Sequence, residues 1–184
     1  KTREYSAAEN NHVWRQLMQT DVGITSSNLF KASPFKKGVK WNESLKSSQE
    51  YDLMFRLLRN GARVAYDGSQ NTIIRERSSG AISRMNLNEK WERYDKLRVD
   101  ILKYRIKSND PQIDSLLQSI FIAIRMLYPY NPSSALNYYN ENIPKSFIPA
   151  TSASITKGYV KSYRLLGFEK TEKLRGLVRP NKAG

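Results

Sequence analysis

The chain contains no cysteine and only one histidine, His12, among its 184 residues. Without cysteine it cannot form a disulfide framework, a thiolate metal site or a cysteine nucleophile. One histidine also excludes a zinc site built from several histidines. No run of about 18 apolar residues occurs, so no segment is expected to span a bilayer. We therefore expect a soluble chain in the cytoplasm whose chemistry does not use thiols.

Acidic residues are scarce relative to basic ones. The chain has 17 Asp and Glu against 31 Lys and Arg, which gives a formal net charge of +14. Residues 151–184 alone hold eight Lys and Arg against two Glu. An excess of this size attracts polyanions, among them nucleic acid, anionic lipid headgroups and phosphorylated substrates. Charge thus limits the class of partner without naming one.

Residues 1–85 mix helical and extended patterns. Asn60-Gly61 supplies a C-terminal stop for a helix whose hydrophobic residues cover most of its circumference, namely Tyr51, Leu53, Met54, Phe55, Leu57 and Leu58. β-branched and small hydroxyl residues favour extended structure elsewhere. The predicted elements are a helix over residues 7–19, an extended segment over 22–30, a helix from about residue 50 to the Asn60-Gly61 stop, and short strands over 63–66 and 71–76.

Residues 86–184 are predicted to be entirely helical, with turns that contain proline or asparagine. Asp110-Pro111 and Asn131-Pro132 have the pattern of an N-cap followed by a first helical residue, and Gly167 is a stop. The first helix begins at the Asn86 capping signature and is expected to bury one apolar stripe, formed by Leu87, Trp91, Tyr94, Leu97, Ile101 and Tyr104. The later helices are expected over residues 110–127, 131–142, 151–166 and 169–178.

Two carboxylates, Glu50 and Asp52, mark the first turn of the helix in the first region. They are two residues apart, so they point about 200° apart on a helix and cannot serve one site as a pair. Glu50 fits an S-x-x-E capping box with Ser47, a structural role that is compatible with catalysis. Asp52 has the i, i+4 spacing for a surface ion pair with Arg56. From the residues alone, capping is the favoured role of Glu50 and an ion pair that of Asp52. If this turn carries a general base, Glu50 is the first candidate and Asp52 is the fallback.

Four short motifs follow one another between residues 21 and 83. They are GITSSNLF at 23–30, VKWNESL at 39–45, QEYDL at 49–53 with Arg56 and Gly61 after it, and IRER at 74–77 with GAIS at 80–83. In this order they resemble the C-terminal half of a family-2 glycosyltransferase with the GT-A type fold. The resemblance implies an α+β but predominantly α chain. Residues 1–85 would be a partial, Rossmann-like half-domain with a few short strands, and residues 86–184 a basic helical extension.

By this resemblance, the family's catalytic base falls on Glu50, in a sequence that reads Gln-Glu where Glu-Asp is commoner in the family. Arg75 and Arg77 would contact the donor phosphates, with Arg77 replacing the family's histidine; from the residues alone they could equally form a solvated charged loop. Trp41 and Glu43 are candidate contacts to the acceptor. The resemblance thus implies an inverting transferase with a nucleotide-sugar donor and a glycan, polysaccharide or lipid-linked acceptor.

The family's nucleotide-binding half, with the acid-x-acid motif that holds a divalent metal, has no counterpart in residues 1–20. We therefore expect this chain to be part of a longer enzyme and inactive alone, with Mg²⁺ or Mn²⁺ held outside it. The basic helices suggest a peripheral contact with an anionic membrane. The alternative is a basic helical module, without enzymatic activity, that binds nucleic acid or another polyanion.

Overall fold

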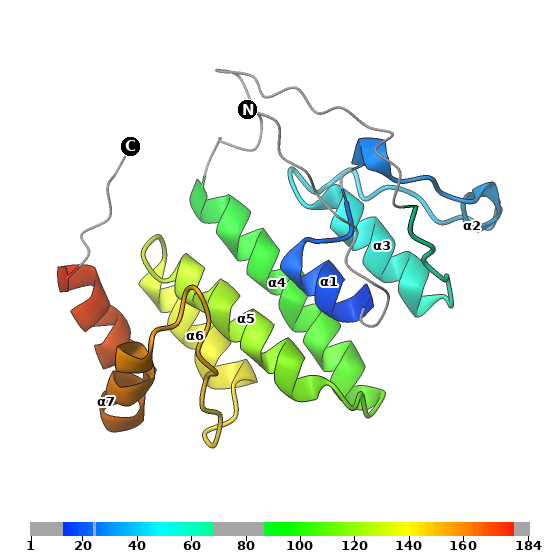
Figure 1. The fold of residues 1–184 in the computed structure, drawn as a ribbon. Coiled ribbons are helices and arrows are strands. Elements are labelled where there is room, and N and C mark those ends of the chain that lie inside the picture. Colours follow the sequence, from blue (N-terminus) through cyan, green and yellow to red (C-terminus); the bar gives the residue numbers. More distant parts are fainter. Residues whose placement is uncertain (1–12, 24, 68–86, 179–184) are drawn as a thin grey trace. The chain divides into compact units, whose positions relative to one another are not determined.

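The computed structural model describes residues 13–23, 25–67 and 87–178 (Figure 1). These residues are predominantly α-helical, which confirms the coarse fold prediction. They divide into two compact units with the boundary between Met85 and Asn86. In the described part of the chain, no helix is both long and apolar enough to cross a membrane.

The first unit is organised by two helices that contact each other, α1 (Val13–Gln19) and α3 (Gln49–Arg59). A 3₁₀ turn (Thr25–Ser27) and the short helix α2 (Ala32–Lys36) lie in the segment between them. Tyr51 on α3 fixes the chain that leaves α1, because its hydroxyl lies 3.0 Å from the carbonyl oxygen of Thr20 and 3.2 Å from that of Gly23. The buried hydrophobic residues of this unit are Leu17, Met18, Val22, Tyr51, Leu53, Met54, Phe55 and Leu57.

The strands expected in the first unit are not found where the structure describes it. Residues 62–67 have no regular secondary structure, so the strand predicted over 63–66 is wrong. The extended segment predicted over 22–30 contains the 3₁₀ turn instead. Local β propensity reflects packing against a partner strand, and exposed residues such as Val64 have no such partner here. The second predicted strand, 71–76, lies outside the described residues.

The second unit contains helices α4 (Leu87–Lys107), α5 (Ile113–Leu127), α6 (Pro132–Asn142) and α7 (Lys157–Val178). Helix α5 lies against both α4 and α6 (Figure 1) and buries most of its circumference. The predicted start of α6 is confirmed, since the Asn131 side chain accepts a hydrogen bond from the backbone N–H of Ser134 at 3.0 Å. Helix α5 starts later than predicted, at Ile113.

The displaced start of α5 follows from what Asp110 does. Its carboxylate accepts from the backbone N–H of Gln112 at 2.9 Å and pairs with Arg105 at 2.6 Å. These contacts close a turn between α4 and α5, so Asp110 does not act as the N-cap of a helix that begins at Pro111. The sequence pattern located the turn but not the first helical residue.

The buried face of α4 differs from the predicted stripe. Ile101 is fully buried as expected, whereas the other described members of the stripe, Trp91, Tyr94, Leu97 and Tyr104, are half-buried. The positions buried in addition to Ile101 are Asp95, Arg98, Val99 and Leu102. Two charged residues on the buried face could not be predicted, because an isolated charge is costly to bury.

Helix α7 is two helical segments joined by a sharp bend at Gly167, where φ is 74° and ψ is −179°. The predicted stop at Gly167 is confirmed. The first segment starts at Lys157 and not near residue 151, because Ser152 and Ile155 close a tight turn through two backbone hydrogen bonds of 2.9 and 3.1 Å. The bend lets the second segment turn back onto α5 through Phe168, which packs against Phe121 at 5.8 Å.

A buried polar network fixes α7 to α5. Glu172 is almost completely buried and pairs with Arg125 at 2.7 Å. The same carboxylate accepts from the Tyr159 hydroxyl at 2.7 Å and pairs with Arg175 at 2.6 Å. Burial raises the pKa of Tyr159, and the charge of Glu172 adds to the effect, so this hydroxyl stays a donor. Arg125 also donates to the carbonyl of Ser154 at 2.9 Å, which anchors the turn before α7.

Candidate functional site

Helix α3 carries the candidate general base at its first turn. Its N-cap is Ser48, in a left-handed conformation (φ 60°, ψ 22°), and the Ser48 side chain forms no capping hydrogen bond. The predicted capping box between Ser47 and Glu50 is not the one found, because it requires Ser47 at the N-cap position. Glu50 is the second helical residue, at the positive end of the helix dipole.

The two carboxylates of this turn have different surroundings. Asp52 accepts from the Nε of Arg56 at 2.9 Å and pairs with its Nη2 at 2.8 Å, which confirms the predicted i, i+4 ion pair. Glu50 is half-buried and forms no hydrogen bond or ion pair within the described residues. Of the two, only Glu50 has a carboxylate that no neighbouring cation neutralises.

Trp41 and Glu43 lie on the turn before α3. The side-chain oxygen of Asn42 accepts from the Ser44 N–H at 3.2 Å and from its hydroxyl at 2.6 Å, which fixes the turn. Glu43 is exposed, and Trp41 is 38% exposed with its ring roughly perpendicular to that of Phe30. The turn therefore presents part of an aromatic ring and a carboxylate to solvent. No hydrogen bond links either to Glu50 in the part of the chain that is described.

The other predicted contacts are not described. Arg75 and Arg77, the candidate donor-phosphate contacts, lie outside the described residues. Within those residues, no group of three or more His, Asp or Glu lies close enough to hold a metal ion. The resemblance places the divalent metal on a donor-binding half outside this chain, so this finding does not bear on that prediction.

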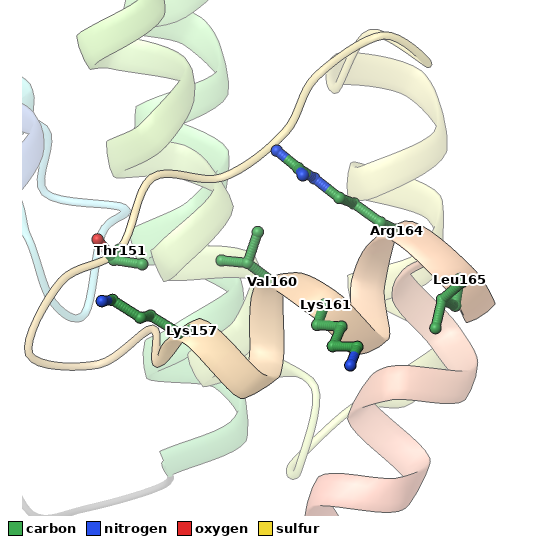
Figure 2. A pocket seen from close by; sticks show the side chains of 6 residues that line it. All are labelled: Thr151, Lys157, Val160, Lys161, Arg164 and Leu165. Atoms are coloured by element: carbon green, nitrogen blue, oxygen red, sulfur yellow. The ribbon is translucent and has the colours of Figure 1, made fainter.

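The sequence analysis did not single out a basic pocket on the first segment of α7. Lys157, Lys161 and Arg164 project from this segment and line the pocket together with Thr151, Val160 and Leu165 (Figure 2). Its volume is about 320 Å³. The i, i+4, i+7 spacing of the cations places them on one helix face, which is the signal that could have identified them. The pocket is suited to an anion, since no acidic side chain lines it.

Comparison of this chain with protein-family models, with curated proteins and with solved structures finds no match in any of the three. The candidate features are therefore defined by their own residues and lie in separate units: the carboxylate of Glu50 and the turn at Trp41 and Glu43 in the first unit, and the cationic pocket of α7 in the second.

Proposed function

We propose that this chain is the acceptor-side part of an inverting glycosyltransferase, in which Glu50 is the general base. The observation that carries the proposal is the contrast at the first turn of α3. Asp52 is neutralised by Arg56, while Glu50 is half-buried at a helix N-terminus with no ion pair in the described structure. A base needs a carboxylate that is ionised and accessible to a hydroxyl proton.

The reaction is a single displacement at the anomeric carbon of a nucleotide sugar. The Glu50 carboxylate takes the proton of an acceptor hydroxyl while that oxygen forms a bond to the anomeric carbon. The bond from that carbon to the diphosphate oxygen breaks, and the nucleoside diphosphate leaves with the electron pair. The configuration at the anomeric carbon is inverted, because attack and departure occur on opposite faces.

The remaining residues have roles in positioning. The exposed part of the Trp41 ring would stack on an acceptor sugar ring, and Glu43 would accept hydrogen bonds from sugar hydroxyls. Arg75 and Arg77 would balance the charge of the donor diphosphate. The acceptor is a glycan, a polysaccharide or a lipid-linked sugar. The donor-binding half and its Mg²⁺ or Mn²⁺ would come from the rest of a longer polypeptide.

The test is Glu50→Gln in the natural polypeptide that carries this chain. With a panel of nucleotide sugars, we expect the acceptor-dependent release of nucleoside diphosphate to fall by about 10²–10⁴-fold, the usual contribution of a general base. Nucleotide affinity should change little, because Gln keeps the size of the side chain. Asp52→Asn is the matched control, and it should retain most of the activity. Full activity of Glu50→Gln, or loss only in Asp52→Asn, would remove Glu50 from the role of base.

The cationic pocket of α7 supports a second candidate function, a module that binds nucleic acid or another polyanion without enzymatic activity. If this is the function, Lys161→Ala with Arg164→Ala should weaken binding of a labelled oligonucleotide and reduce the dependence of log K on log salt concentration by about 2. The control is Lys103→Ala with Lys107→Ala on α4, which removes the same charge elsewhere in the second unit. Equal losses in both pairs would indicate attraction by net charge alone.

A further inference from the structure

A second cationic surface lies in the first unit, on residues 29–41, which we call the lysine–aromatic loop. All of its charged residues are basic and exposed, namely Lys31, Lys36, Lys37 and Lys40. No Asp or Glu occurs between residues 22 and 42. None of these four lysines forms an ion pair within the described residues. The loop is therefore a concentrated positive charge that no neighbour in the described chain neutralises.

The loop is folded around three aromatic rings. The ring of Phe30 lies roughly perpendicular to those of Phe35, at 6.1 Å, and Trp41, at 6.5 Å. The two ends of the loop, at Phe30 and Trp41, are therefore held together. Backbone hydrogen bonds of 3.1 Å close the tip, from Gly38 to the carbonyl of Phe35 and from Val39 to that of Pro34. The charges and rings thus belong to one structured element.

The loop also exposes apolar surface. Leu29 is fully exposed, with a relative accessibility of 102%, and Trp41 is 38% exposed. Phe30 and Phe35 are half-buried, and their burial comes in part from each other. An exposed leucine and tryptophan among unpaired lysines combine the two features of surfaces that bind membranes at the interface, apolar side chains that insert and cations that meet the headgroups.

We propose that the lysine–aromatic loop docks on the surface of a bilayer that contains anionic lipids. The lysine ammonium groups would pair with headgroup phosphates, while Leu29 and Trp41 enter the boundary between headgroups and acyl chains. A hydrated glycan or nucleic acid would use the lysines and Trp41 but would leave Leu29 in water, so the exposed leucine favours lipid. The inference does not depend on Glu50 or on sugar transfer. It assigns Trp41 to lipid, which excludes simultaneous stacking on an acceptor sugar, and it places the contact in the first unit instead of the basic helices.

The test is binding of the chain to vesicles of phosphatidylcholine with about one third phosphatidylserine, measured by co-sedimentation. Lys36→Ala with Lys37→Ala should lower the partition coefficient about 30-fold, because each lysine near an anionic surface strengthens binding by slightly more than about fivefold. Leu29→Gln should lower it about fivefold. In a chain that keeps Trp41 as its one tryptophan, after Trp14→Phe and Trp91→Phe, vesicles should shift the emission to shorter wavelength.

A matched control comes from α7, which offers two exposed cations and a leucine that is 75% exposed. Lys161→Ala with Arg164→Ala, and separately Leu165→Gln, should change partition less than about threefold. Lys36→Arg with Lys37→Arg keeps the charge and should bind as the wild-type chain does. The proposal would be overturned if the wild-type chain bound vesicles of pure phosphatidylcholine as well as those with phosphatidylserine. It would also be overturned if the α7 variants lost as much binding as the loop variants, or if vesicles did not shift the Trp41 emission. The proposal would also be overturned if Lys36→Ala with Lys37→Ala lost binding to soluble polyphosphate but kept binding to vesicles. The loop would then bind a soluble anion and not a membrane.

Discussion

At the scale of single residues, Asp95 on α4 has the most unusual environment of any described carboxyl group. Its side chain is fully buried, and neither oxygen accepts a hydrogen bond from the described residues. Burial raises the pKa of Asp95 to about 7, and the nearby charge of Arg98 offsets only part of this effect. A carboxyl group in such a site favours the protonated form, because the ionised form loses its hydration without gaining donors.

This environment predicts a pH-dependent stability. The unfolded chain has an Asp pKa of about 3.9, so between about pH 4 and pH 7 the folded protein binds the extra proton. The contribution of Asp95 to the free energy of unfolding therefore falls as pH rises, by at most about 4 kcal/mol in total. Asp95→Asn removes this titration. We expect the variant to unfold at a higher urea concentration than the wild-type chain at pH 8 and at a similar concentration near pH 4.

The comparison requires an exposed aspartate as control, because other groups also titrate in this range. Asp114→Asn on α5 changes an exposed side chain, and its difference from the wild-type chain should be small compared with that of Asp95→Asn at pH 8. If the difference between Asp95→Asn and the wild-type chain is constant from pH 4 to pH 8, the Asp95 carboxyl group does not have a raised pKa.

At the scale of elements, the bend of α7 depends on the backbone conformation of Gly167. With φ at 74° and ψ at −179°, Gly167 lies in a region that only glycine adopts readily. A Cβ atom there would meet nothing within 4 Å, so a substitution costs backbone strain without a clash. Gly167→Ala should therefore lower the free energy of unfolding by about 1–3 kcal/mol in a urea titration.

The matched control lies nine residues further along the same helix. A Cβ atom at Gly176 would also meet nothing within 4 Å, but its backbone is helical. Gly176→Ala should raise the free energy of unfolding by up to about 1 kcal/mol, because alanine has the higher helix propensity. If Gly167→Ala raises the free energy of unfolding as Gly176→Ala does, the bend at Gly167 imposes no conformational requirement.

The elements that the sequence predicted well are those defined by local chemistry. Proline at the first position of α6, asparagine as its N-cap and glycine at the bend of α7 each act within a few residues, so their effects can be read from the sequence. The strand predicted over 63–66 failed because a strand depends on a distant partner. The Arg125–Glu172 network was missed for the same reason, since its members lie on different helices. The buried charges of α4 were missed because an apolar stripe is the usual guide to a buried face, and Asp95 and Arg98 are not part of one.

The candidate site, like the elements of the fold, could be predicted from the sequence where it depends on local chemistry. The ion pair of Asp52 with Arg56 follows from i, i+4 spacing and is confirmed. The capping role of Glu50 depended on the first helical residue, and a shift of the N-cap from Ser47 to Ser48 removed it. Whether Glu50 is a base stays a prediction, because catalysis depends on a donor and an acceptor that no local pattern defines.

At the scale of the whole molecule, each unit has its own buried residues, and the network around Glu172 lies entirely within the second. This separation predicts that damage to the network leaves the first unit folded. Glu172→Gln removes the charge that balances buried Arg125, and such a change costs about 3–5 kcal/mol. We expect the urea midpoint of the second unit to fall while that of the first stays constant.

Tryptophan fluorescence can measure the two units separately. After Trp91→Phe, the remaining Trp14 and Trp41 report on the first unit; after Trp14→Phe and Trp41→Phe, Trp91 reports on the second. Glu169→Gln is the control, because Glu169 pairs with Lys173 on the exposed face of the same helix, at 2.6 Å, and such surface pairs contribute at most about 1 kcal/mol. It should move neither midpoint appreciably. If Glu172→Gln lowers both midpoints equally, the two units unfold as one cooperative body, and their separate cores do not make them independent.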